Sequence, residues 1–369
     1  MAEFLTSSLF GELTKRVQIR FDKVSELNKQ LYDNIIFEDY LDWDTPTIAT
    51  EFSEIIGQYG LTVMAPTIGE NSKEAIVGHE GLQTMSERLL THAITTPMTA
   101  QDYRKILTIL DSKAISDAAK TKQLVDIMFK NVDFTVKAVL TKLDYIFLKT
   151  LFNEGVMTLD GDNNPEGGVR GTINFNQPAA NIATAATNWI DSNIDTVDCM
   201  EDIEAIIDAA SDKVTFKEIL CSPGRISFMR RSKKMKQMIW GTDKSSRLVS
   251  LADINAYMSA NGYPTFKAIR RQMVVQNGPA KTTVNPVTEG NMVFVPEGKL
   301  GLVKNAYLNN ELRPEAGITY SNYGRVRVAQ WGVGEKEGSN GVEFTKAEAL
   351  ALPAITEMQG IYTLKTINL

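Results

Sequence analysis

The sequence is organised around one uninterrupted stretch, DSKAISDAAKTKQLVDIMFKNVDFTVKAVLTKLDYIFLKTLFNE, which runs from Asp111 to Glu154 without proline or glycine. Its apolar residues recur in steps of three and four, the spacing that marks one face of a helix. They are Leu124, Ile127, Met128, Val132, Val136, Val139, Leu143, Ile146, Phe147 and Leu151. Gly155 follows as a C-terminal stop. The pattern predicts one helix of roughly 40 residues, ~60 Å long, which suits a brace along a large flat domain.

The composition of the whole chain limits the class of protein to which it can belong. The chain has 369 residues, enough for two or three structural units, and 43% of them are hydrophobic, as in ordinary globular proteins. The formal net charge of −6 argues against a dedicated nucleic-acid binder, which is usually basic. No run of 18 apolar residues occurs, so no transmembrane helix is expected. The start, Met1 to Phe10, lacks the pattern of a signal peptide, so we expect a protein that is made and used in the cytoplasm or that reaches its final location by assembly.

Few residues are available for chemistry. The sequence has two cysteines, Cys199 and Cys221, and two histidines, His79 and His92. A disulfide framework and a zinc site are therefore not expected, and a reducing compartment is the simpler expectation. No P-loop, dinucleotide-binding or hydrolase motif is present. We expect no catalytic residue and no cofactor.

The first hundred residues predict an arm and a long hairpin. Residues 1–34 have helical periodicity, which fits a helix docked on its own domain or an arm on a neighbouring subunit. Residues 35–47 are acidic and aromatic and are interpreted as an extended linker. Residues 55–96 alternate loosely and are rich in glycine, which predicts a long two-stranded hairpin that contacts another subunit. A short helix is expected at 99–110.

The middle of the chain predicts a mixed α/β unit. Residues 178–211 are expected to be helical, with Asp198 and Glu201 as a capping box. A strand at 216–221 follows, and then a helix with Ser222 as N-cap and Pro223 at its first position. Short strands are expected at 266–269, 273–276 and 292–296. Before this unit, residues 160–168 begin like an EF-hand loop, but Pro165 stands where that loop needs glycine, so a hairpin turn is favoured.

The last fifty residues predict a return to the long helix. Arg325 to Val328 alternates charged and branched residues, as a half-exposed strand does. Residues 332–341 are expected to form a loop, 344–352 a short helix and 361–369 a final strand. We expect the apolar face of the long helix to pack on the strands at 325–328 and 361–369.

Two features of the middle region could bind a partner. A basic run on a predicted helix comprises Arg225, Arg230, Arg231, Lys233, Lys234 and Lys236. A solvated helix face is favoured, contacts to acidic neighbours in an assembly come second, and nucleic-acid contact is a minor alternative. The junction from Cys221 to Arg225 is similar to a phosphate-binding helix N-terminus, although ordinary helix capping explains it better. Cys221 is interpreted as a buried, inert thiol.

The order of these parts resembles the tailed-phage major capsid fold, often called the Hong Kong 97 fold. In its second half the chain is similar to the lambda-like major capsid protein E family. That similarity rests on ILCSP at 219–223, NMVFVPEG at 291–298, GLV at 301–303 and EALALPA at 348–354.

The resemblance implies an α+β fold with an N-terminal arm (residues 1–54), an extended β-hairpin loop (55–98), a peripheral domain with a long spine helix (99–177), an α/β axial domain (178–315) and a return to the peripheral domain (316–369). It also implies a shell protein that forms hexamers and pentamers of an icosahedral head around double-stranded DNA. A separate scaffold protein, a portal and decoration proteins would be partners, DNA contact would be weak and non-specific, no membrane would be involved, and assembly would take place in the bacterial host cytoplasm.

We therefore expect residues of the hairpin and of the basic run to contact other subunits. The candidates are Lys73, Glu74, His79, Glu80, Arg88, Arg230, Arg231, Lys233 and Lys234. Some capsids of this fold crosslink through a Lys–Asn isopeptide bond, and Lys73 is the lysine of the predicted hairpin, but neither an acceptor nor a catalytic acid can be assigned. The alternatives are the shell of an encapsulin-type compartment, a cytosolic α/β enzyme that uses the Cys221–Arg225 junction, and a tail or baseplate component.

Overall fold

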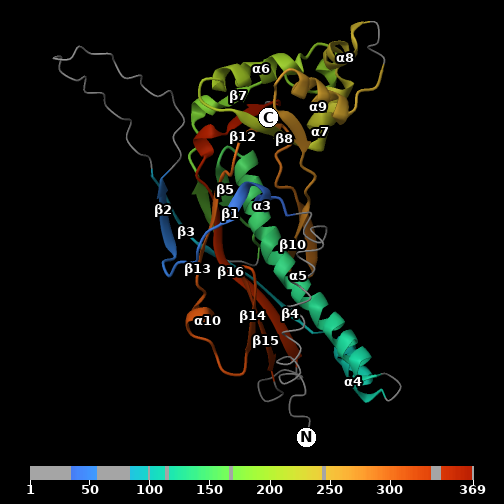
Figure 1. Cartoon of the computed structure of the whole chain (residues 1–369), viewed down its shortest axis with the longest axis vertical. Coiled ribbons are helices and arrows are strands. Elements are labelled where there is room, and N and C mark those ends of the chain that lie inside the picture. The colour runs from blue at the N-terminus through green and yellow to red at the C-terminus, as the bar shows by residue number, and fades with distance from the viewer. Residues whose placement is uncertain are drawn as a thin grey trace, which may run out of the picture.

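The computed structural model describes residues 35–55, 84–98, 100–112, 116–165, 169–242, 247–333 and 342–367. Figure 1 shows an elongated molecule in which a group of helices lies at one end and long strands run to the other. Helix α5 (Asp117–Phe152) connects the two ends along the side of the strands. No helix in the described ranges is long and apolar enough to span a bilayer.

The long helix is confirmed, but it begins later than expected. It has 36 residues and starts at Ser116, whose side chain accepts a hydrogen bond from the amide of Ala119. Residues before this cap form a separate helix, α4 (Ala100–Asp111). At the other end Gly155 has a φ of +80° and donates its amide hydrogen to the carbonyl of Thr150, so it serves as the expected stop.

A six-stranded sheet packs against α5. It contains β1 (Leu41–Trp43), β4 (Leu90–Pro97), β13 (Gly301–Ala306), β14 (Thr319–Tyr323), β15 (Val326–Val333) and β16 (Val342–Ile355). Strand β16 is central, because it pairs antiparallel with β4, β13 and β15. Val132, Val136 and Val139 of α5 share a buried cluster with β15 residues Val326 and Val328, so the expected packing of the long helix on this strand is confirmed.

The short helix expected at 344–352 is wrong, because these residues lie within β16. Alanine and leucine favour helices, and that propensity misled the prediction. Every second residue is buried in this stretch, and Ala347 and Ala349 lie in one cluster with α5. Their small side chains leave room for the helix, so tertiary packing overrides local propensity.

A second sheet has five strands in the order β7 (Ile182–Thr184), β17 (Tyr362–Lys365), β12 (Asn291–Pro296), β8 (Phe216–Cys221) and β9 (Thr265–Ala268). Its helices are α6 (Cys199–Ala210), α7 (Pro223–Arg231), α8 (Lys233–Trp240) and α9 (Leu251–Ala260), which lie together at the top of Figure 1. Helices and strands share one buried cluster, which confirms a mixed α/β unit. The expected N-caps Asp198 and Ser222 are both present.

Three expectations about this part of the chain need correction. The helical region expected at 178–211 contains short 3-10 turns (Ala179–Asn181 and Asp191–Asn193) and strand β7, and α6 begins only at Cys199. Residues 182–184 are extended and not helical because they form the edge strand β7, which pairs in parallel with β17. Strand β17 also belongs to this second sheet, whereas the apolar face of the long helix was expected to pack on it as well as on the strand at 325–328. Strand β13, expected in the α/β unit, pairs instead with β1 and β16.

The remaining elements are three two-stranded hairpins and short turns. The hairpins are β2 (Glu51–Ile55) with β3 (Thr84–Arg88), β5 (Val156–Leu159) with β6 (Gly171–Asn174), and β10 (Met273–Asn277) with β11 (Ala280–Val284). One-turn elements occur at α10 (Asn309–Leu312) and at Met358–Gly360. The hairpin turn favoured after Asp160 is confirmed, since the Asp160 carboxylate accepts from the amides of Asp162 and Asn163.

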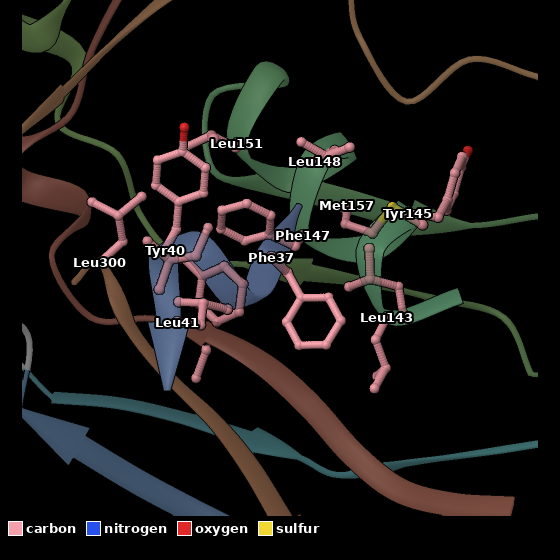
Figure 2. Packing of buried hydrophobic residues seen from close by; sticks show 14 of the residues in the cluster. Phe37, Tyr40, Leu41, Leu143, Tyr145, Phe147, Leu148, Leu151, Met157 and Leu300 are labelled. Carbon is pink, nitrogen blue, oxygen red and sulfur yellow. The ribbon is translucent and has the colours of Figure 1, made fainter. Parts of the chain in front are cut away.

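The linker expected at 35–47 is instead part of the core. Residues 37–40 form the short helix α3 (Phe37–Tyr40), and β1 follows directly. Figure 2 shows Phe37, Tyr40 and Leu41 packed against Phe147 of α5, with the Tyr40 and Phe147 rings stacked at 5.8 Å between centroids. The aromatic residues that suggested an extended linker therefore fasten this segment to the long helix.

Candidate assembly surfaces

The β2–β3 hairpin is the first candidate surface. Within the described part of the chain these two strands pair only with each other, and Figure 1 shows them on the side of the molecule away from α5. The hairpin is held at its base, where the amide of Leu89 donates to the carbonyl of Thr50 at 2.8 Å and Leu89 is buried. Arg88 lies exposed at this base, opposite Glu51 in the register. The candidates Lys73, Glu74, His79 and Glu80 lie outside the described residues.

A buried carboxylate anchors the start of the described chain. Asp144 of α5 is fully buried, and its Oδ1 accepts from the amides of Ile36 and Phe37 at 2.8 and 2.9 Å. Its Oδ2 accepts from Arg271 Nε at 3.0 Å. Burial raises the pKa of Asp144, while Arg271 and the two amides act in the opposite direction. This one side chain joins α5, the segment that precedes α3, and the segment before β10.

Sequence reasoning did not single out Asp144, although a signal was present. Asp144 stands alone within the run Leu143 to Leu148, which is otherwise apolar. An ion in such a run has to be paired when the helix is buried, because an isolated buried charge is very costly. The sequence could therefore have flagged Asp144 as a paired residue, but not Arg271 as its partner.

The buried His92 of β4 and the half-buried Lys142 of α5 form a second polar group. The side chain of His92 is 8% exposed, and its Nε2 donates to the carbonyl of Ala351 at 3.2 Å. Burial, together with the nearby charge of Lys142, lowers the pKa of His92 to about 4. Burial also lowers the pKa of Lys142 to about 8, and its Nζ donates to the carbonyl of Asn163 at 2.9 Å. His92 is thus a neutral structural histidine at pH 7.

The basic run is divided between two helices, because Ser232 separates α7 from α8. Arg225 does not belong to the surface, since it is 8% exposed and its Nη1 donates to the carbonyl of Trp189 at 2.7 Å. Arg231 pairs with Asp191 at 2.8 Å, and Lys234 pairs with Asp198 at 3.3 Å. Arg230 donates through Nε to the carbonyl of Val249 at 2.8 Å. Lys233 is exposed. The single basic face that we expected is therefore partly neutralised within the subunit.

The Cys221–Arg225 junction holds a carboxylate of the chain itself. Ser222 Oγ accepts from the amide of Arg225 at 3.3 Å and donates to the carbonyl of Glu289 at 3.3 Å. The Glu289 carboxylate lies over Gly224, where an added Cβ would overlap Oε1, and it is 3.9 Å from Arg225 Nε. Ordinary capping is confirmed, and the Glu289 carboxylate lies beside this helix start.

The thiol at this junction is unsuited to nucleophilic chemistry. Burial raises the pKa of Cys221 to about 12, so its thiol stays protonated at pH 7. Cys221 and Cys199 are both free and buried, as expected for inert thiols. Among the described residues no group of three or more histidine, cysteine, aspartate or glutamate side chains could hold a metal ion.

Comparisons with known proteins place the chain in a family. The family model for phage major capsid protein E matches residues 13–366. No curated protein matches the chain.

Solved structures share its fold at low sequence identity. A protein described as a prophage capsid protein from Escherichia coli CFT073 is 13% identical, with a TM-score of 0.53, and the alignment covers 94% of this chain and 99% of that one. A phage-related protein from Bordetella bronchiseptica RB50 is 9% identical, with a TM-score of 0.50 and coverage of 90% and 92%. The encapsulin complex of Synechococcus elongatus PCC 7942 is 10% identical, covers 90% and 86%, and has a TM-score of 0.34, which is too low to support the compartment hypothesis.

These findings agree with the architecture described above. The long helix α5, the two sheets and the β2–β3 hairpin form a mixed helix and sheet structure, as in these solved structures. The family model covers nearly all of the sequence. The chain therefore belongs to the phage major capsid protein E family and is a capsid shell protein.

Proposed function

We propose that this capsid protein forms the hexamers and pentamers of an icosahedral head that encloses the double-stranded DNA of a tailed phage. Family membership supports self-assembly into a shell. The observation that carries the proposal further is the β2–β3 hairpin, which pairs with no other described strand. A two-stranded hairpin alone is marginally stable in water, so a hairpin of this kind requires a surface on another molecule.

The two sheets suggest how a subunit is divided. The six-stranded sheet with α5 would be the peripheral domain, and the five-stranded sheet with α6 to α9 would be the axial domain. The sheet pairings support a division in which residues 301–306 would belong to the first domain and 362–365 to the second, in place of the expected boundaries at 178–315 and 316–369. Of the expected arm (1–54), residues 37–43 join the core, so the arm would be the part that precedes α3. Of the expected loop (55–98), β4 joins the six-stranded sheet, so the extended loop would be the segment from β2 to β3.

Shell assembly would use many modest contacts. The candidate contact residues on the loop are Lys73, Glu74, His79, Glu80 and Arg88, and those on the axial domain are Arg230, Arg231, Lys233 and Lys234. Individually weak interfaces add up when one subunit engages several neighbours at once. This is packing and not catalysis, and the capped Cys221–Arg225 junction supports a non-catalytic role.

The same proposal implies several partners. A scaffold protein, a portal and decoration proteins would act with the shell, and assembly would take place in the host cytoplasm. The net charge of −6 favours weak, non-specific contact with the packaged DNA, since a strongly basic surface would bind its phosphates tightly.

An excision of the loop tests this proposal. Ile55 and Thr84 are register partners, so the dipeptide Asn-Gly in place of residues 56–83 can close the hairpin as a two-residue turn. We expect a subunit with unchanged circular dichroism, because Leu89 and β4 remain, and no closed shells in negative-stain electron microscopy of the purified protein.

A second excision serves as the control. Val333 and Val342 are also register partners, so Asn-Gly in place of residues 334–341 closes another hairpin in the same manner. It shows whether such a closure by itself affects folding. Normal particles from the variant that lacks residues 56–83 would contradict the proposed role of the loop.

A further inference from the structure

Two helix faces of the axial domain carry opposite charges that the subunit leaves unpaired. On α8 and just before it, Arg230, Lys233 and Lys236 have no carboxylate partner in the described part of the chain. On α6, the exposed residues Glu201 and Asp208 are seven positions apart and so lie on one face of the helix, and the exposed Asp212 lies in the turn that follows it. None of these three acids has an ion-pair partner among the described residues. Two surfaces of opposite sign thus remain after folding.

The acids at the end of α6 and the bases at the start of α8 also oppose the dipoles of their own helices. A helix is positive at its first turn and negative at its last turn, so acids are favoured at the start and bases at the end. Helix α8 has no acid in its first turn but begins with Lys233, Lys234 and Lys236. Helix α6 has no base in its last turn, which contains Asp208, and Asp212 follows it. Lys213 is adjacent to Asp212, but this end of α6 still has an excess of negative charge. Basic side chains would stabilise the end of α6, and acidic side chains would stabilise the start of α8.

The two ends are too far apart to neutralise each other within one subunit. Lys234 of α8 reaches Asp198 at the start of α6. Asp208 lies ten residues further along, which is ~15 Å at the rise of an α-helix. Both helices lie at the same end of the molecule (Figure 1), where a neighbouring copy could approach them together. Charge complementarity therefore fits a second copy of this chain.

We propose that the acidic end of α6 in one subunit docks against the basic start of α8 in the next. The contact is heterologous, because different surfaces of the two copies meet, and repetition of such a contact around an axis closes a ring. Exposed Ala205 and Ala209 on α6 allow close approach of the backbone. This inference rests on the proposed assembly into rings and names the surfaces that hold the axial domains together.

Reciprocal charge reversal tests the contact in the full chain. One variant carries Lys233→Glu with Lys236→Glu, and a second carries Asp208→Lys with Asp212→Lys. Each places like charges across the contact, which suppresses association, so we expect the concentration for half-maximal ring formation to rise at least about ten-fold in analytical ultracentrifugation. A chain with all four changes should recover association, because it restores opposite charges at every contact. The matched control, Lys217→Glu with Lys281→Glu, changes the same charge at exposed lysines on β8 and β11 and should associate like the wild type.

A mixture of the two double variants gives a sharper outcome. The first variant carries acidic residues on both surfaces and the second carries basic residues on both, so each variant can bind only the other. The two variants must therefore alternate around a ring, and only rings with an even number of subunits can form. We expect six-membered rings and no five-membered rings in electron micrographs of the mixture. Five-membered rings at the wild-type frequency would overturn the inference.

Other results separate this inference from the proposed function. Wild-type rings together with normal rings from both double variants would overturn the α6–α8 contact and leave shell assembly standing. A wild-type chain that remains monomeric at every concentration would overturn both. Reversed lysines that leave the rings intact but lower the DNA content of particles would overturn the contact and assign the α8 surface to DNA.

Discussion

Replacing Asp144 by alanine removes three hydrogen bonds from the centre of the subunit. The amides of Ile36 and Phe37 and the guanidinium of Arg271 would lose their acceptor at once. The hydrogen bonds are shielded from solvent, since Asp144 is fully buried and the Arg271 side chain is only 11% exposed. We therefore expect a large loss of stability from a single side chain that lies far from the candidate assembly surfaces.

The magnitude follows from the groups left without a partner. Each buried donor that loses its acceptor costs about 1–3 kcal/mol, and removal of one member of a buried ion pair costs about 3–5 kcal/mol. The donors share one acceptor residue, and water can reach some of them after the change. We expect the free energy of unfolding to fall by about 4 kcal/mol, a large part of the 5–15 kcal/mol that is typical of a folded protein.

Urea unfolding of the unassembled subunit, followed by tryptophan fluorescence, measures this loss. A double variant, Asp144→Leu with Arg271→Met, removes both charges and should lose less stability than Asp144→Ala, because it leaves no buried guanidinium unpaired. The control is Asp133→Ala, which removes a partly exposed i,i+4 pair with Lys137 on the same helix and should cost less than about 1 kcal/mol. A loss below about 1 kcal/mol for Asp144→Ala would refute the assigned anchoring role.

Two further predictions concern the strands around α5. The pKa of His92 is about 4 in the folded protein, below its ordinary value of 6.5. The unfolded chain therefore takes up a proton at His92 first as the pH falls. The free energy of unfolding should decrease between pH 6.5 and pH 4 for this reason. We expect a loss of about 2 kcal/mol between pH 7 and pH 5 in urea titrations, and His92→Gln should remove that part of the loss; an equal pH dependence in both proteins would contradict it. Gly301 has a φ of +155°, and an added Cβ would overlap the backbone carbonyl of Ala354, so Gly301→Ala should lower the melting temperature strongly. Gly278→Ala, which has open space around it, should lower the melting temperature much less, and equal effects of the two substitutions would argue against the steric reason.

Local sequence signals were sufficient where the physical cause is local. The periodicity between Leu124 and Leu151 predicted α5, because residues three and four apart lie on the same face of a helix. Ser222 and Asp198 predicted helix starts, because their side chains bond to amides two or three residues ahead. The hairpin turn after Asp160 was predicted because Pro165 stands where an EF-hand loop needs glycine.

The candidate assembly surfaces were predictable only in part. The glycine-rich alternation around residue 60 indicated a projecting hairpin, and the structure shows its base at β2 and β3. The sequence showed the basic run, but it did not show that the run is split between α7 and α8 and partly paired with acids. Arg225 is buried on a carbonyl of Trp189, and Arg231 and Lys234 pair with acids about forty positions away in the sequence. Which charges remain free for a partner is therefore a property of the folded chain.

By itself the sequence determined the long helix, its stop at Gly155, the N-caps Asp198 and Ser222, and the resemblance to a capsid fold. Only the tertiary structure decided that residues 344–352 form a strand, that α3 is part of the core, and that β13 and β17 join sheets other than those expected. The physical reason is the range of the interactions. Helix periodicity and capping act within about four residues. Strand pairing and the partner of a buried charge such as Asp144 depend on residues more than a hundred positions away, which local patterns do not identify.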